Sequence, residues 1–192
     1  KILLFPCHVL LNQEIDNLAN NNHLHLNQFI GLVKSLMIKK KSILSIKFFN
    51  HQNDDFYKKI WKKNFGENVK ILDSRNSYKG SVFNKHDLII VDDFSTAFYE
   101  LLYYKKPFIV LNSAPNVNYN KKFWMAINEL KKINLWFDNE KELSRYLDKN
   151  FEKIIFNWNK ITRSKPYVKL RKTLFVRENF NDSLFIKNIL KL

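Results

Sequence analysis

The sequence predicts an α/β protein with a Rossmann-like, doubly wound parallel sheet and extra C-terminal helices. Apolar runs of strand length alternate with longer segments of helical periodicity along most of the 192 residues. The run LIIV at 88–91 is continuously apolar, which is typical of a strand covered on both faces. Hydrophobic residues make up 45% of the chain, which is enough to form a sizeable core.

The first half of the chain supplies four strands and two clear helices. Apolar runs predict strands at 1–7, 42–50, 69–73 and 87–93. Apolar residues recur at helical spacing within 28–38. The segment 54–66 begins on aspartates and ends at a glycine, as a capped helix does. Residues 74–86 leave room for only one or two helical turns.

The second half continues the alternation. It predicts helices at 95–106, 120–132 and 139–160 and strands at 107–113 and 133–137. Asn139 and Glu142 have the spacing of a capping box, and one or two surface helices are expected around Pro166. We expect all four tryptophans to pack in the core, with stacking on a base or sugar as the alternative for Trp124.

The net charge of +15 raises the question of a nucleic-acid partner. Only five of the 33 basic residues are arginine, the side chain that forks onto phosphates and base edges. Lysine is abundant together with Asn, Ile and Phe, a pattern that AT-rich coding produces without any selection for binding. We therefore expect no nucleic-acid partner, while peripheral contact with anionic membrane lipids stays open.

The start of the chain and its cysteine content bear on location and completeness. Cys7 is the single cysteine, which excludes an intrachain disulfide and favours a reducing compartment, so we expect a cytoplasmic protein, with a position at the inner face of the membrane left open. The sequence contains no run of 18 apolar residues, so it does not predict a membrane span. The opening KILLFPC reads as a core strand, with neither an initiating Met nor a signal peptide. We expect an upstream, Rossmann-like N-terminal domain in the natural protein.

The junction VDDFSTAFYE, at 91–100, has the features of an anion site. A strand ends there and a helix begins at Ser95 and Thr96, so free N–H groups and the helix dipole face the carboxyl edge of the sheet. Glu100 lies one turn further on the same helical face as Thr96, where it can accept hydrogen bonds from sugar hydroxyls. Each residue also has an ordinary alternative, as an N-cap, a partner of the dipole or a solvated side chain.

This segment resembles the donor-binding segment in the C-terminal half of GT-B fold transferases. Its spacing is similar to that of the CDP-glycerol glycerophosphotransferase type and of bacterial surface-carbohydrate glycosyl- and sialyltransferases. The matching positions are Asp93, Phe94, Ser95, Thr96, Glu100, Lys106 and Pro107. The resemblance implies that Ser95 and Thr96 hold the donor phosphates and that Glu100 holds the ribose. It also implies a nucleotide-donor domain at 1–160, a helical extension at 161–192 and a catalytic base on the other half of the enzyme.

A histidine near the same edge of the sheet supports the prediction of a phosphate site there. His51 follows the second predicted strand, where related sialyltransferases have a His-Pro pair whose imidazole contacts the nucleotide phosphate. Here the next residue is Gln52, so a plain surface-loop histidine is an equal alternative. Asp92 and Asp93 could be read as a magnesium site, but the resemblance implies metal-independent chemistry, and we expect no cofactor.

These observations lead to one function and one competitor. We expect a transferase that moves a sugar or polyol-phosphate group from a CMP-, CDP- or UDP-linked donor to a cell-surface glycan acceptor. The alternative is a non-enzymatic basic α/β module that binds nucleic acid or an anionic surface, and a relative that has lost turnover is also open. The chain has no Gly-x-Gly-x-x-Gly, P-loop or Gly-x-Ser-x-Gly motif, which argues against dinucleotide oxidoreductases, P-loop NTPases and α/β-hydrolases.

Overall fold

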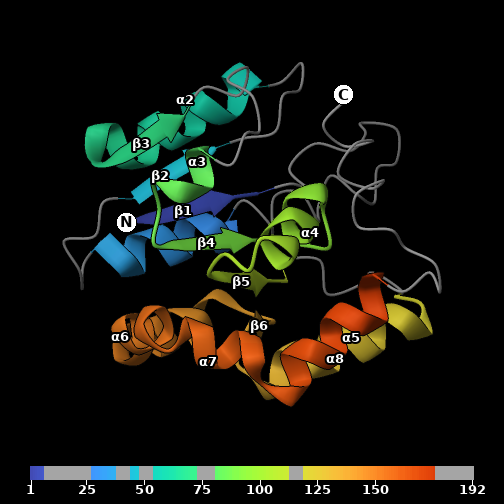
Figure 1. The fold of residues 1–192 in the computed structure, drawn as a ribbon. Helices are drawn as coiled ribbons and strands as arrows, with labels where there is room; N and C mark the ends of the chain where they lie inside the picture. The colour runs from blue at the N-terminus through green and yellow to red at the C-terminus, as the bar shows by residue number, and fades with distance from the viewer. Residues whose placement is uncertain (7–26, 38–43, 48–53, 73–80, 113–118, 176–192) are drawn as a thin grey trace.

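The computed structural model describes residues 1–6, 27–37, 44–47, 54–72, 81–112 and 119–175. Within these residues, six strands form one sheet with the order β3-β2-β1-β4-β5-β6, and every neighbouring pair is parallel (Figure 1). The strands are β1 (Ile2–Phe5), β2 (Leu44–Lys47), β3 (Val69–Leu72), β4 (Leu88–Val91), β5 (Phe108–Leu111) and β6 (Trp136–Phe137). The order changes direction between β1 and β4, and this switch point is where open α/β sheets bind ligands beyond the carboxyl ends of the strands.

Helices cover both faces of the sheet. They are the segment 27–37, α2 (Asp54–Phe65), α3 (Ser81–Asn84), α4 (Thr96–Tyr103), α5 (Lys121–Lys132), α6 (Glu140–Phe156), α7 (Trp158–Arg163) and α8 (Lys165–Phe175), with a 3₁₀ turn at Gly66–Asn68. Because parallel crossovers are right-handed, the strand order puts 27–37 and α2 on one face and α4 and α5 on the other. The doubly wound fold that the sequence predicted is therefore confirmed.

Two C-terminal helices, α6 and α8, pack on opposite faces of the sheet. The hydroxyls of Ser35 and Ser144 are hydrogen-bonded, which joins helix 27–37 to α6. On the opposite face α8 packs along α5 (Figure 1), where Lys169 Nζ lies 2.9 Å from the buried carboxylate of Glu129. Lys132 contacts the same carboxylate, and hydrogen bonds from Lys169 and Lys132 hold the pKa of Glu129 below its usual value.

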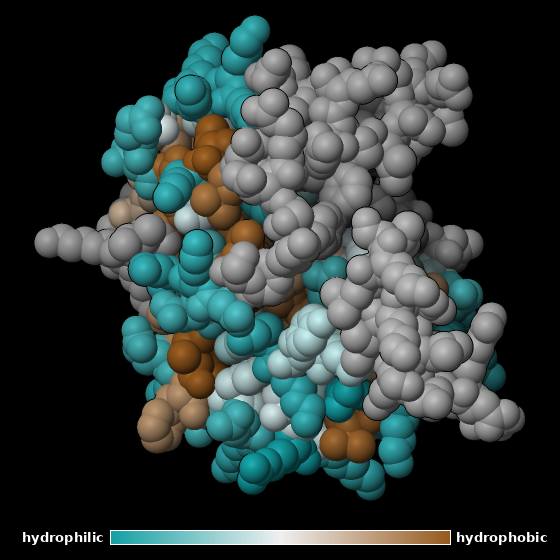
Figure 2. Space-filling model, turned by 45° about the horizontal axis from the view of Figure 1, so that its top comes forward, coloured by the Kyte–Doolittle hydropathy of each residue, from teal (hydrophilic) through white to brown (hydrophobic). Residues whose placement is uncertain are grey.

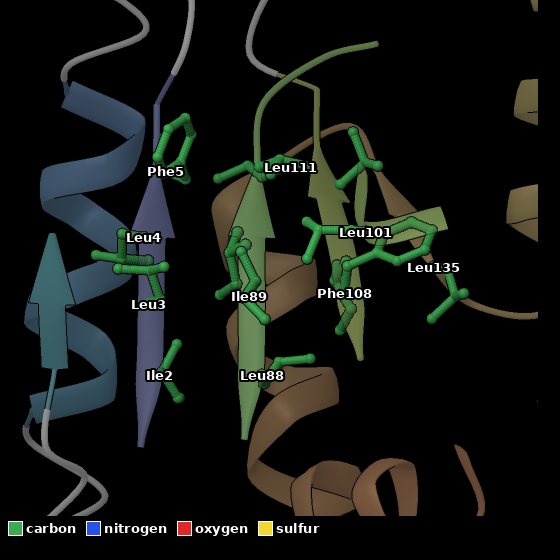
Figure 3. Close-up of a cluster of buried hydrophobic side chains, with 14 of the residues drawn as sticks. Ile2, Leu3, Leu4, Phe5, Leu88, Ile89, Leu101, Phe108, Leu111 and Leu135 are labelled. Carbon is green, nitrogen blue, oxygen red and sulfur yellow. The ribbon is translucent and has the colours of Figure 1, made fainter. Parts of the chain in front are cut away.

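The core lies where the central strands meet these helices. Every residue of β1, β4 and β5 is buried, and their side chains pack with Leu101 of α4 and with Leu135 (Figure 3). On the face drawn in Figure 2, hydrophilic residues cover most of the coloured surface, with apolar patches between them. Three tryptophans are buried, but Trp124 is 48% exposed. The expectation that all four pack in the core is wrong for this one, because it lies outside the row of α5 residues that faces the sheet.

Most predicted elements match the structure within a few residues, and Asn139 caps the start of α6 as its spacing from Glu142 predicted. The side-chain oxygen of Asn139 accepts from Glu142 N at 2.8 Å. The single helix predicted at 139–160 is wrong, because it divides at Asn157 into α6 and α7. Asn157 Nδ2 bonds back to the carbonyl of Lys153, and the indole of Trp158 donates to the carbonyl of Lys105. This long-range bond turns Trp158 into the core and redirects the chain.

Candidate functional site

The turn between β4 and α4 lies at the carboxyl edge of the sheet, beside the switch point. β4 ends at Val91, and the chain passes through buried Asp92 and half-buried Asp93 before Ser95 caps α4. Ser95 Oγ accepts from Phe98 N at 3.4 Å, which leaves its hydroxyl hydrogen able to donate elsewhere. Thr96 is the first helical residue and is exposed.

Glu100 lies one helical turn beyond Thr96, on the side of α4 away from the buried residues. Its side chain is half-buried, and this burial raises the pKa of its carboxyl to about 7. No cation in the described part of the chain counteracts the shift. Glu100 is therefore balanced between its neutral and ionised forms near neutral pH, and a nearby hydrogen-bond donor would favour ionisation.

Tyr119 ties the β4–α4 turn to the start of α5. Its hydroxyl donates to Asp93 Oδ1 at 3.2 Å. Its ring meets Phe94 edge-on at 5.8 Å. Burial, the neighbouring Asp93 charge and this hydrogen bond raise the pKa of Tyr119 well above its usual value, so it stays a donor at neutral pH. The N-terminus of α5, capped by Asn120, is thereby held close to the N-terminus of α4.

A second polar group continues along the same edge. The carboxylate of Asp138, just after β6, accepts from Trp136 Nε1 at 2.9 Å, Lys131 Nζ at 2.6 Å and Asn112 Nδ2 at 3.4 Å. Burial opposes ionisation of Asp138, but the bonds from Lys131, Trp136 and Asn112 outweigh it and hold its pKa below the usual value. This network joins the residue that follows β5, Asn112, to the residue that follows β6, Asp138.

Comparison with known proteins shows the family to which the chain belongs. A family model described as LIC12162 family transferase matches residues 2–181. The chain belongs to the LIC12162 family of transferases. No curated protein and no solved structure matches it. Membership in the LIC12162 family supports an enzyme that transfers a group, and it leaves the donor and acceptor to be determined.

The predicted site residues of this LIC12162 family member gather on one short segment. Asp93, Ser95, Thr96 and Glu100 lie together on the β4–α4 turn and the first turns of α4, and their roles in binding a nucleotide stay predictions. His51 lies outside the described residues. Asp93 already accepts a hydrogen bond from Tyr119, so it positions the turn.

Sequence reasoning missed Tyr119, Asn112 and Asp138. Asn112 and Asp138 each directly follow a strand, and polar residues at such positions meet at the carboxyl edge of a parallel sheet, so this signal could have found them. Tyr119 had no comparable local signal, because its partner is 26 residues away.

The described residues contain neither a metal-binding cluster nor a helix that could span a membrane. No group of three or more His, Cys, Asp or Glu side chains there is arranged to hold a metal ion. In the same part of the chain, every helix is too short or too polar to cross a membrane.

Proposed function

We propose that this LIC12162 family transferase takes a sugar or polyol-phosphate group from a CMP-, CDP- or UDP-linked donor and passes it to a cell-surface glycan acceptor. The observation that carries the proposal is the β4–α4 junction. A hydroxyl-bearing turn opens a helix at the carboxyl edge of the sheet, next to the switch point, with a half-buried carboxyl one turn along. The resemblance of 91–107 to donor-binding segments supports the nucleotide as ligand.

The N-terminus of α4 would hold the donor phosphates. The first intrahelical bond runs from Tyr99 N to the carbonyl of Ser95, so the N–H groups of Thr96 and Ala97 precede the helical ladder and point out of it. The helix dipole favours an anion at this end. The hydroxyls of Ser95 and Thr96 add two further donors to the phosphate oxygens.

Glu100 would hold the ribose. Four residues of helix advance the chain by about 6 Å, comparable to the span from a nucleotide phosphate to its ribose hydroxyls. An ionised carboxylate accepts hydrogen bonds from both hydroxyls of a ribose. Ribose binding would therefore stabilise the ionised form of Glu100 and lower its pKa on binding.

The chemistry follows from where negative charge develops. An acceptor hydroxyl loses its proton and attacks the transferred group, and the bond from that group to the leaving phosphate oxygen breaks, so the departing nucleotide gains charge. Preorganised N–H groups and hydroxyls at the α4 N-terminus stabilise that charge. We assign the base to no residue of this chain, and we propose that it comes from an upstream domain.

The location and metal requirement are part of the same proposal. The resemblance to GT-B transferases supports a reaction without a bound metal. The single cysteine supports a position in the reducing cytoplasm. Turnover that persists after treatment with EDTA would support the first point, and turnover that requires added Mg²⁺ would contradict it.

Isothermal titration of CMP, CDP and UDP into the chain tests the binding site. We expect saturable binding that is weakened by Thr96→Val and Glu100→Gln and unchanged by the matched controls Thr173→Val and Glu152→Gln, which lie on α8 and α6. The competing basic-module function predicts the opposite pattern: binding that falls steeply with salt and ignores the base, the ribose and both site variants.

A further inference from the structure

The corner between α6 and α7 exposes an aromatic side chain. Phe156, the last residue of α6, is 87% exposed. Trp158, two residues later, is buried and donates to the carbonyl of Lys105. The bend at Asn157 thus directs one aromatic residue inward and leaves the other in solvent, where an apolar ring lacks packing partners.

An apolar groove runs beside this corner. It has a volume of about 340 Å³. Ile133, Tyr146, Ile154 and Ile161 supply apolar walls, and Lys153 and Lys160 also line it. The groove thus combines an apolar interior with ammonium groups, and one of its lining residues, Asn157, directly follows the exposed Phe156 in the chain.

The charge around the corner is strongly positive. Residues 149–165 contain five Lys or Arg and one acidic residue, Glu152. Lys153 and Lys160 are exposed, and neither forms an ion pair with another residue in the described ranges. Basic groups around an apolar surface match the arrangement of a bilayer, in which anionic headgroups lie above the acyl region.

The corner lies at the opposite edge of the sheet from the β4–α4 turn. Ile133, which lines the groove, precedes β6, so the groove lies near the edge of the sheet formed by the N-terminal ends of the strands. The 17 residues of α6 begin after β6 and return along the sheet for about 25 Å before reaching Phe156. A partner bound here leaves the carboxyl edge accessible.

We propose that the α6–α7 corner is a docking surface for an anionic lipid bilayer. Phe156 enters the boundary between headgroups and acyl chains, the groove receives apolar lipid atoms, and Lys153 and Lys160 contact lipid phosphates. A second copy of the chain would bring the same lysines together and be repelled. A nucleic-acid duplex keeps its base faces stacked inside and presents phosphates and sugars, so it offers little apolar surface to the groove. The surface therefore fits a membrane better than either.

Sedimentation with vesicles tests this proposal without reference to the donor site. We expect binding to phosphatidylcholine vesicles that contain phosphatidylglycerol and little binding to phosphatidylcholine alone. Lys153→Gln/Lys160→Gln should weaken binding about thirtyfold, since each lysine near an anionic surface contributes about a fivefold factor. The matched control is Lys62→Gln/Lys63→Gln, which also removes two lysines from the last turn of a helix. Equal loss in both double variants would overturn the proposal.

A label at the corner separates lipid insertion from general adhesion. Phe156→Cys in a Cys7→Ser background provides one thiol for an NBD dye. We expect the dye emission to shift to the blue on adding the anionic vesicles. No shift with bound vesicles would contradict insertion, and a shift that appears without vesicles as protein concentration rises would show a second copy to be the occupant. Nucleotide titration of Lys153→Gln/Lys160→Gln should match the wild type. Vesicle binding therefore tests the docking surface, and nucleotide binding tests the donor site, independently of each other.

Discussion

Nucleotide binding should depend on pH through Glu100. Burial raises the pKa of this carboxyl to about 7, so about one tenth of it is ionised at pH 6 and about nine tenths at pH 8. If the ribose hydroxyls bind the ionised form, affinity for a nucleotide-sugar should rise about tenfold over this range. Binding at pH 7 should release about half a proton.

Calorimetry in buffers with different ionisation enthalpies measures both quantities. A nucleotide-sugar is the suitable ligand because its diphosphate diesters keep the same charge between pH 6 and 8. Glu100→Gln should bind more weakly at pH 8, with no pH dependence and no proton release, while Glu152→Gln, at an exposed position of α6, should behave as wild type. A tenfold rise that persists in Glu100→Gln would refute the reasoning.

The same shift has a consequence for stability. Because the pKa of Glu100 is higher in the folded state than the ordinary carboxyl value of 4.5, the folded state binds the proton more tightly. The resulting stabilisation is fully present below about pH 4.5 and is lost as the pH rises through about 7. Glu100→Gln should therefore raise the melting temperature at pH 8 relative to the wild type and leave it nearly unchanged at pH 4.5. An equal change at both pH values would show that burial of this carboxyl is not the cause.

Three further predictions concern the frame around the site. Tyr119→Phe removes the hydrogen bond to Asp93 and should lower the free energy of unfolding, measured in urea, by about 1.5 kcal/mol; no loss would show that the bond contributes nothing. Lys105 has a φ of 53°, in the left-handed region that favours glycine, so Lys105→Gly should raise the melting temperature through a gain of about 0.5–1 kcal/mol, whereas a decrease would contradict this account. Glu129→Gln removes the carboxylate that Lys169 contacts, so amide exchange in α8 should become faster while β4 is unchanged, and equal protection of α8 would contradict that role.

The sequence predicted those features that depend on neighbours in the chain. The continuous apolar run of β4 indicated a strand covered on both faces, and every residue of it is buried. Ser95 or Thr96 was predicted near the N-cap because the pair follows that strand and precedes a helical period, and the structure has Ser95 there, with its hydroxyl accepting from Phe98 N. Asn139 and Glu142 predicted the start of α6 for the same local reason.

Features that depend on distant residues could not be predicted in this way. The amphipathic period continues through Asn157, so local periodicity indicated one helix, yet the bond from Trp158 to Lys105 spans 53 residues and requires the bend. The bond from Tyr119 to Asp93 likewise depends on β4 and β5 being neighbours. The exposure of Trp124 reflects which side of α5 the sheet and α8 cover, and hydrophobicity alone does not encode that choice.

Binding of the nucleotide phosphates at the α4 N-terminus can be followed residue by residue through amide chemical shifts while CDP is titrated into the ¹⁵N-labelled chain. We expect the largest shifts at saturation at the amides of Thr96 and Ala97, and we expect cytidine, which lacks phosphates, to leave these amides nearly unmoved. Largest shifts elsewhere on the chain, with Thr96 and Ala97 unaffected by CDP, would contradict binding of the phosphates at this helix end.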